Sequence, residues 1–354
     1  MTAPRLEIDL DKIYHNARTL VERLARRGIS VTGVTKASLG SLDIANTLLR
    51  AGVHALGDSR VENIEAMRGG HVAAPMMLIR SPMLSQADRV VRQADTSFNT
   101  ELAVINRLSC AARDVNRMHN IVLMVELGDL REGIMPADLK EVVRAVLRMP
   151  NIHLSGIGAN LACHGGVSPD ADNMSELSAL ADSVEAFFGV SLELVSGGNS
   201  ANLDWALSGV DTGRINNLRL GEAILLGCEP LHRQPIKGLY TDAITLVAEV
   251  IEAKVKPARP WGTIAQTAFG EAAVVDCGGD MSRAILAIGH QDVDPSGLQA
   301  PCGIRILGAS GDHLIIHSDS LHQAAGAEVR FGLNYSALVR AMTSPFVAKV
   351  IRDG

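Results

Sequence analysis

The sequence predicts a (β/α)8 TIM barrel followed by a C-terminal β-rich domain, on the basis of two observations. Eight short apolar segments alternate with helical segments over about 200 residues, which is the pattern of a (β/α)8 barrel. After Gly227 prolines become frequent, and strand-like segments alternate with glycine-rich turns. An open, doubly wound sheet is the alternative for the first part, because it has the same alternation.

The alternating elements occupy residues 1–235, which we predict to be the barrel domain. Residues 6–10 alternate apolar and acidic side chains and are expected to form a strand that can join the β domain. Asp11 is expected to cap the helix that follows. The predicted barrel strands are residues 29–36, 53–58, 76–80, 95–99, 121–127, 154–160, 192–196 and 217–221, and helices are predicted at residues 41–49, 60–67, 84–93, 101–116, 137–147 and 173–188.

Residues 236–354 are predicted to form the second domain. Segments 243–251, 305–307 and 314–316 are rich in β-branched residues, as strands are. A helical pattern returns only near residues 335–342. The second domain is therefore expected to be mostly β.

Composition excludes several classes of protein. Hydrophobic residues make up 47% and charged residues 20% of the 354 residues, a balance typical of globular proteins with a substantial core. The net charge of −6 argues against nucleic acid as the main partner. No apolar run approaches the ~20 residues of a membrane span, and the N-terminus lacks the layout of a signal peptide.

The cysteines indicate a reducing compartment, and we expect the protein in the cytoplasm. They are odd in number, scattered and without a CxxC pair, so the sequence predicts neither a disulfide framework nor a zinc site. The five are Cys110, Cys163, Cys228, Cys277 and Cys302.

Polar residues stand at the ends of the predicted barrel strands. Lys36 closes the first, Arg131 follows the fifth and Asn160 closes the sixth. The loop of residues 196–200 (Ser-Gly-Gly-Asn-Ser) follows the seventh strand, and Arg219 lies in the eighth. The carboxyl ends of barrel strands meet at one mouth, so these groups are expected to converge.

This combination suggests pyridoxal 5′-phosphate as a cofactor. A lysine at the end of a buried strand has a lowered pKa, and its neutral amine is a nucleophile towards carbonyls. The small residues of the 196–200 loop, which opens a helix, suit a phosphate group. An arginine at the mouth can face the pyridine nitrogen.

Eight stretches of the sequence also resemble one family along nearly the whole chain. The chain is similar to the alanine/ornithine racemase family of fold type III pyridoxal-phosphate enzymes, and most of all to its ornithine racemase branch. The stretches are residues 31–36, 57–63, 127–133, 158–163, 196–200, 216–225, 289–294 and 309–314.

The resemblance implies roles for individual residues. Lys36 is implied to carry the cofactor and to act as one of two racemisation bases, and Arg219 to face the pyridine nitrogen without giving up its proton. Asn160 is implied to lie at the cofactor, and Arg131 to face the substrate carboxylate. The phosphate-binding positions are Ser200, Gly221 and Glu222, the last two through backbone N–H groups.

The second base is not where the resemblance puts it. Alanine racemases use a tyrosine from the β domain of the partner subunit, but residues 261–267 contain none. His290 and His313 are the candidates in its place, since each lies close in sequence to a carboxylate, Asp292 or Asp312, that can orient an imidazole. Asp312 is also a predicted substrate contact.

The resemblance further implies a racemase of ornithine or another basic amino acid, active as a head-to-tail homodimer. Alternatives are a pyridoxal-phosphate lyase (aldolase or dehydratase) for hydroxy amino acids and a non-catalytic cofactor-binding regulator. The lyase would carry a metal on residues such as Cys163, His164 and Asp312, but we predict no metal site. Loop carboxylates that can meet a distal ammonium group are Asp129, Glu132, Asp292 and Asp294.

Overall fold

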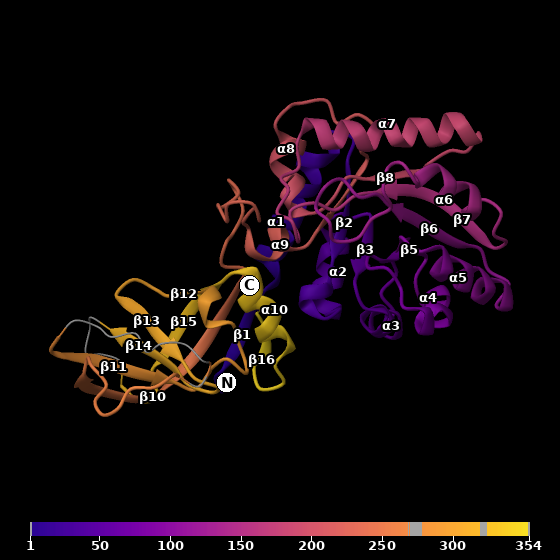
Figure 1. Cartoon of the computed structure of the whole chain (residues 1–354). Coiled ribbons are helices and arrows are strands. Elements are labelled where there is room, and N and C mark those ends of the chain that lie inside the picture. Colours follow the sequence, from indigo (N-terminus) through magenta and orange to yellow (C-terminus); the bar gives the residue numbers. More distant parts are fainter. Residues whose placement is uncertain (1, 268, 270–277, 319–323, 353–354) are drawn as a thin grey trace. The chain divides into compact units, whose positions relative to one another are not determined.

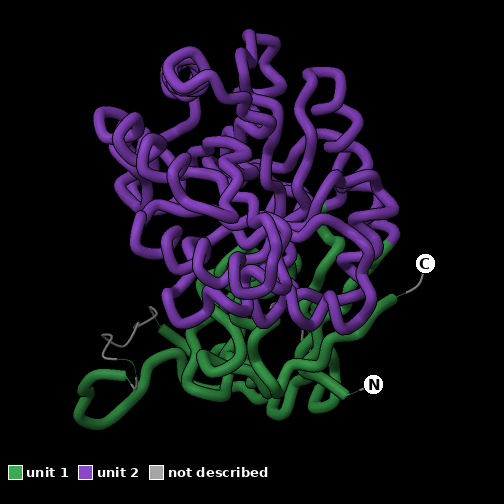
Figure 2. The backbone as a smooth tube through the Cα atoms, turned by 90° about the vertical axis from the view of Figure 1, so that its right-hand side faces the viewer, with its two compact units in different colours: residues 1–10, 241–354 green, residues 11–240 purple. Residues whose placement is uncertain are grey.

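The structure is a computed structural model of the whole chain, and it describes residues 2–267, 269, 278–318 and 324–352. Two compact units are present: unit 2 is residues 11–240, and unit 1 is residues 1–10 together with 241–354 (Figure 2). Cys277 lies outside the described residues. The predicted domain boundary after residue 235 stays a prediction.

Unit 2 contains a closed barrel of parallel strands, which confirms the predicted fold class and shows that the open-sheet alternative is wrong. Neighbouring strands pair in chain order, and β2 pairs with β9 to close the barrel. The strands are β2 (Ser30–Val34), β3 (Ala55–Asp58), β4 (Met76–Leu78), β5 (Thr96–Asn99), β6 (His119–Met124), β7 (Ile152–Gly158), β8 (Leu194–Ser196) and β9 (Asn217–Leu220).

Helices cover the outside of the parallel strands (Figure 1). The α-helices of this part are α1 (Leu10–Ala25), α2 (Leu42–Arg50), α3 (Val61–Gly69), α4 (Ala87–Gln93), α5 (Leu102–Asp114), α6 (Leu139–Val146), α7 (Ala171–Phe188), α8 (Leu203–Leu207) and α9 (Glu222–Leu226). Short 3-10 helices are η1 (Lys36–Ser38), η2 (Leu84–Gln86) and η3 (Ser200–Asn202).

The barrel is filled by side chains from alternating strand positions. One buried cluster joins Ala55, Met77, Phe98, Val122 and Met124 from four neighbouring strands. Strands buried on both faces favour apolar residues, and the apolar run at the end of β6 is the clearest case. The filled interior leaves the mouth at the carboxyl ends of the strands as the place for chemistry.

Two predicted details are wrong at the edges of elements. Helix α1 begins at Leu10, so Asp11 lies inside the first turn and does not cap the helix. Strand β2 ends at Val34, and Lys36 already belongs to the turn η1. An acidic side chain in the first turn still favours the helix, because it faces the positive end of the helix dipole.

Unit 1 is built on one antiparallel sheet, in the order β12-β15-β10-β11-β14-β13. Strand β1, from the start of the chain, pairs antiparallel with β10 and parallel with β16. The elements are β1 (Arg5–Asp9), β10 (Ile244–Pro257), β11 (Asp280–Leu286), η4 (Pro295–Gly297), β12 (Leu298–Gln299), β13 (Ile304–Ala309), β14 (Leu314–Ser318), β15 (Glu328–Leu333), α10 (Tyr335–Thr343) and β16 (Ala348–Arg352).

Candidate active site

Lys36 stands at the carboxyl end of β2, at the mouth of the barrel. Its side chain is accessible to solvent, yet protein surrounds the amine on enough sides to desolvate its charge. This desolvation is the main reason that the pKa of Lys36 lies below that of an ordinary lysine. Other ionisable groups that act on the amine are, in order of effect, Cys163, Arg131, Asp58 and Arg219.

Arg219 projects from β9 and is buried. Its guanidinium donates to Ser196 Oγ at 2.5 Å, to the Ala159 carbonyl at 2.8 Å and to Asn160 Oδ1 at 3.3 Å, and lies 5.2 Å from the centre of the Phe98 ring. Burial lowers the pKa of Arg219 to about 10. The side chain is therefore still a cation at neutral pH.

The Asn160 amide is oriented by two donors. Its Oδ1 accepts from Arg219 and, at 3.1 Å, from Asn199 Nδ2. The remaining amide group, Asn160 Nδ2, is a buried donor without a hydrogen-bond partner among the described residues. An unpaired buried donor costs about 1–3 kcal/mol, so the site fits a ligand that presents an acceptor there.

Ser200 connects the loops after β8 and β9. Its buried Oγ accepts from the Ala223 N–H at 3.2 Å, in the first turn of α9. Because the oxygen is the acceptor, the hydroxyl proton is left to donate to a ligand. Gly198 in the same loop has φ +151°, and a Cβ there would lie 2.0 Å from a side-chain oxygen of η3, so only glycine fits.

The positions after β9 also fit the implied phosphate site. A Cβ on Gly221 would lie 3.1 Å from Val34, so this glycine allows a close approach of β9 to β2. Helix α9 begins at Glu222, and the first N–H groups of a helix have no partner inside it. The Glu222 side chain pairs with Arg233, which leaves the backbone as the part of Glu222 for a phosphate.

Arg131 lies at the mouth in the loop after β6. Its guanidinium pairs with Glu132 and donates to Cys163 Sγ at 2.6 Å. Asp129 is buried in the same loop and accepts from the N–H groups of Cys163 and His164. The loops after β6 and β7 are thus held together, with Arg131 and Cys163 side by side.

The four carboxylates considered for a distal ammonium group already have partners within the protein. Asp129 accepts backbone N–H groups and Glu132 pairs with Arg131. Asp292 accepts from Ser344, and Asp294 accepts from two serines. A basic substrate would have to compete with these contacts.

The histidine candidates lie close together in unit 1. The His290 N–H donates to the Ser310 carbonyl at 3.0 Å, which joins its segment to the turn that carries Asp312 and His313. His313 Nδ1 lies 2.6 Å from Asp312 Oδ1, so this imidazole has the orienting carboxylate that the sequence predicts. The contact lowers the pKa of the Asp312 carboxyl.

The predicted pairing of His290 with Asp292 is not formed. Asp292 is buried and accepts from Ser344 Oγ at 2.8 Å, while the His290 ring packs against Phe269 with 4.1 Å between ring centres. The reason is that Asp292 turns towards the segment after α10, a contact that sequence proximity does not reveal.

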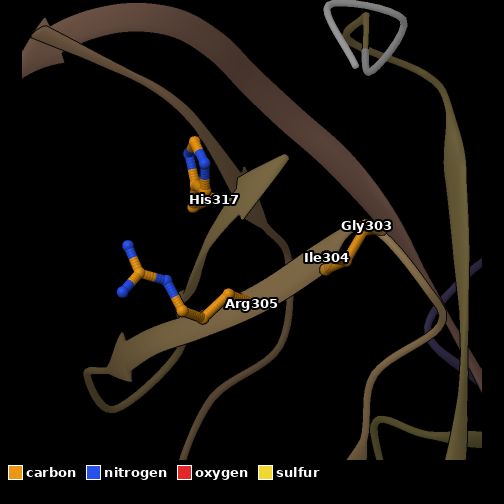
Figure 3. Close-up of a pocket in the computed structure, with 4 residues that line it drawn as sticks. All are labelled: Gly303, Ile304, Arg305 and His317. Carbon is orange, nitrogen blue, oxygen red and sulfur yellow. The ribbon is translucent and has the colours of Figure 1, made fainter. Parts of the chain in front are cut away.

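A pocket of about 320 Å³ lies in unit 1, lined by Gly303, Ile304, Arg305 and His317 (Figure 3). Arg305 and His317 face each other in register on β13 and β14, and His317 Nδ1 lies 2.8 Å from the Ser282 carbonyl. None of these described lining residues is a predicted site residue.

The described part of the chain offers neither a metal site nor a membrane-spanning helix. No group of three or more His, Cys, Asp or Glu side chains there is arranged to hold a metal ion. None of its helices is long and apolar enough to cross a membrane. The four described cysteines are free thiols.

Sequence reasoning gave no role to two residues that the structure places at the mouth. Asn199 fixes the amide of Asn160, and Asp58 is a buried carboxylate at the end of β3. The sequence shows that both residues lie at or after the end of a predicted strand, where functional residues gather. It does not show their hydrogen-bond partners, because these come from neighbouring strands.

Comparison with known proteins identifies the family. Residues 8–229 match the family described as alanine racemase, N-terminal domain. The chain is 39% identical over 351 residues to the ornithine racemase of Acetoanaerobium sticklandii, covering 98% of this chain and 99% of that protein. It is 37% identical over 352 residues to the lysine racemase of Thermotoga maritima, covering 99% of each.

Solved structures share the fold. The alanine racemase of a D-cycloserine-producing Streptomyces lavendulae superposes with a TM-score of 0.77 at 20% identity, covering 100% of this chain and 98% of that one. The matched region of the family includes Lys36, Arg219 and the positions predicted to bind a phosphate. The chain therefore belongs to the alanine racemase N-terminal domain family, as its sequence led us to expect.

Proposed function

We propose that this protein is a pyridoxal-phosphate-dependent racemase that interconverts the L and D forms of ornithine or another basic amino acid. The observation that carries the proposal is the end-to-end similarity to both an ornithine racemase and a lysine racemase. Lys36 and Arg219, at one barrel mouth, supply the two groups that the cofactor needs most.

The residues of the mouth fit the cofactor. When bound, pyridoxal phosphate supplies the electron sink that makes the Cα proton of an amino acid acidic. Lys36 would hold it covalently, and Arg219 would donate to the pyridine nitrogen while keeping its own proton. Asn160 Nδ2, which has no partner among the described residues, would donate to an acceptor on the bound group.

The phosphate would be held by Ser200 and by the backbone of Gly221 and Glu222. Ser200 Oγ already touches the first turn of α9, so hydroxyl and backbone donors converge. Donors fixed in this way lose little conformational freedom on binding an anion.

Racemisation moves a proton off one face of Cα and onto the other. Lys36 would serve one face, helped by the lowered pKa of its amine. His313 is the stronger candidate for the other face, because Asp312 orients its ring; His290 is the second candidate. Arg131 would bind the substrate carboxylate in exchange for Glu132, and Asp312 is a further candidate contact to the substrate.

We also propose a head-to-tail homodimer in which the β domain of each subunit completes the active site of the other. The candidate second bases belong to unit 1, whereas the cofactor residues belong to unit 2. This separation of the candidate bases from the cofactor residues is what we expect if a second subunit completes each active site. Cytoplasmic localisation remains a prediction from the scattered cysteines.

A test of the reaction incubates the purified protein with a panel of L-amino acids in D2O. We expect deuterium at Cα and the D-isomer with ornithine or lysine, and little of either with alanine. Cleavage or dehydration of a hydroxy amino acid would instead support the lyase alternative. Absence of exchange with every amino acid, despite bound cofactor, would refute the racemase.

The cofactor role of Lys36 has a separate test. The wild-type protein should be yellow, and borohydride should fix the cofactor on the peptide that contains Lys36. Lys36→Ala should lose both properties, while Lys237→Ala, at an exposed lysine of the same unit, should keep them. Cofactor fixed to another lysine would overturn the assignment.

A further inference from the structure

Asp58 is a buried carboxylate for which the proposed chemistry has no role so far. It is the last residue of β3 and has no exposed surface. Removing a carboxylate from water is costly unless donors surround it. The groups that donate hydrogen bonds to Asp58 therefore indicate its role.

Three donors converge on Asp58. Thr35 Oγ1 donates to Oδ2 at 2.7 Å, while the Arg60 N–H at 2.9 Å and Asn63 Nδ2 at 3.0 Å donate to Oδ1. Burial raises the pKa of the Asp58 carboxyl, and the hydrogen bonds from Thr35, Arg60 and Asn63 act against that rise. We infer that the three donors favour the ionised, acceptor-only form. Asp58 thus places a negative charge at the mouth.

The hydrogen bond from Thr35 connects Asp58 to Lys36. Thr35 directly precedes Lys36, and its N–H donates to the Gly57 carbonyl at 2.9 Å. Backbone and side chain of Thr35 are therefore both fixed to the end of β3. The Thr35 carbonyl in turn accepts from Ser38 Oγ at 2.9 Å, which shapes the turn that begins at Lys36.

The turn is also held against α3. A Cβ on Gly40, which has φ +67°, would lie 2.9 Å from the Asn63 carbonyl. Asn63 is the residue that donates to Asp58. One carboxylate thus joins β3, α3 and the start of the turn that carries Lys36.

We propose that Asp58 is a positioning residue for Lys36, which fixes through Thr35 the backbone that carries the lysine and balances part of the positive charge around its amine. The proposal rests on the role of Lys36 proposed above. It assigns no contact of Asp58 with substrate or cofactor.

The charge balance at Lys36 involves groups from several elements around the mouth. Burial lowers the pKa of the lysine, and Asp58 acts against that shift. The ionisable groups that act on Lys36 or respond to it are Asp58, Arg131, Cys163, Arg219 and Glu222. Neutralising Asp58 removes one charge that favours the protonated amine, so the amine should lose its proton at a lower pH.

The test measures how fast acetic anhydride acetylates Lys36 in the full-length, cofactor-free protein from pH 6 to 10, by mass spectrometry of the Lys36 peptide. Only the neutral amine reacts. We expect the Asp58→Asn profile to move to lower pH, with acetylation about three- to tenfold faster below the midpoint, since one pKa unit is a factor of ten. The exposed Lys237 serves as the reference within each sample.

Asp95→Asn is the matched control. Asp95 precedes β5 at the opposite edge of the barrel, and its carboxylate accepts from Arg68 and from the Met76 N–H at 2.8 Å. Its loss should weaken the fold without moving the Lys36 profile. An unchanged profile in a folded Asp58→Asn protein, or an equal shift in Asp95→Asn, would overturn the proposal.

Thr35→Val separates the hydrogen bond from the charge and replaces Asp58→Asn if that variant does not fold. It removes the hydroxyl donor and keeps the carboxylate. We expect at least threefold weaker binding of pyridoxal phosphate, restored by Thr35→Ser; unchanged affinity would contradict the proposal. Borohydride labelling of wild-type Lys36 tests the proposed function separately, because it does not depend on Asp58.

Discussion

Arg219 is a buried charged side chain whose two terminal nitrogens donate to groups of the barrel wall. Its hydrogen bonds to Ser196 and Ala159 compensate part of the cost of burial, and the Phe98 ring adds a favourable contact with the cation. Three acceptors in fixed directions suit a planar guanidinium and not an ammonium group. The residue type at this position is therefore set by geometry as well as by charge.

Arg219→Lys should accordingly be damaging although it preserves the charge. Ser196 and Ala159 would lose donors, and we expect the free energy of unfolding to fall by about 2 kcal/mol in urea titrations. Racemisation should fall at least tenfold. Arg214→Lys is the control, since Arg214 pairs with Glu185 and Asp182 at the surface and should cost less than about 1 kcal/mol. Equal losses in the two variants would show that burial of Arg219 is not the cause.

His119 makes stability depend on pH. It is buried at the start of β6, with Nε2 2.8 Å from Ser97 Oγ, and burial lowers its pKa to about 4. On acidification, this histidine therefore becomes protonated near pH 6.5 in the unfolded chain but only near pH 4 in the folded chain. Stability is retained above pH 6.5 and lost as the pH falls through this window, by about 3 kcal/mol at most.

His119→Gln should remove that part of the pH dependence. Melting temperatures measured from pH 4 to 7 should converge at low pH, with the wild type losing more stability than the variant on acidification. His54→Gln, at an exposed histidine, gives the matched substitution at the surface. Parallel curves for wild type and His119→Gln would contradict the prediction.

At the scale of elements, the loops after β6 and β7 depend on one carboxylate. Asp129 is buried, which works against its charge, but N–H groups of the second loop donate to it and lower its pKa. The Gly165 N–H also donates to the Asp129 carbonyl at 3.0 Å, and a Cβ on Gly165 would lie 2.7 Å from that oxygen. The close fit positions Arg131 against Cys163.

Asp129→Asn should loosen this pair of loops, because an amide NH2 would face backbone donors. We expect a loss of about 1–3 kcal/mol and faster hydrogen exchange at residues 161–167. Asp138→Asn is the control, since Asp138 precedes α6, is exposed and makes no side-chain capping bond. Unchanged exchange in the folded Asp129→Asn protein would show that the loops are held by other contacts.

At the scale of the whole molecule, the chain begins and ends in the same unit. β1 pairs with β10 and β16, so the sheet of unit 1 needs residues from both ends of the chain. Arg5 and Glu7 on β1 also form ion pairs with Glu328 and Arg330 on β15. Unit 1 can therefore be completed only after the barrel sequence has been made.

The proposed dimer is tested by mass in solution. Light scattering should give about twice the 37.5 kDa of one chain. Mixing inactive Lys36→Ala with inactive His313→Gln should restore part of the activity, because one composite site would contain both intact residues. A monomer with full activity would refute the dimer, and absence of restored activity from a mixed dimer would refute the shared site.

Sequence alone determined the barrel, the order of its strands and the residues at their ends. Strands buried on both faces favour apolar residues, which makes them visible in the sequence. Parallel strands of a barrel end at one mouth, which identifies the residues that gather there. Lys36, Arg219, Asn160 and Ser200 could be selected in this way.

Only the tertiary structure decided which polar groups have partners. It paired Asp292 with Ser344 and Asp58 with Thr35. Such contacts depend on directions and distances of about 3 Å between segments far apart in sequence, and residue patterns carry no information at that scale. The sequence thus determined at which end of the barrel the candidate site residues lie. The packing of the strand ends determined the hydrogen-bond and ion-pair partners of each charged group.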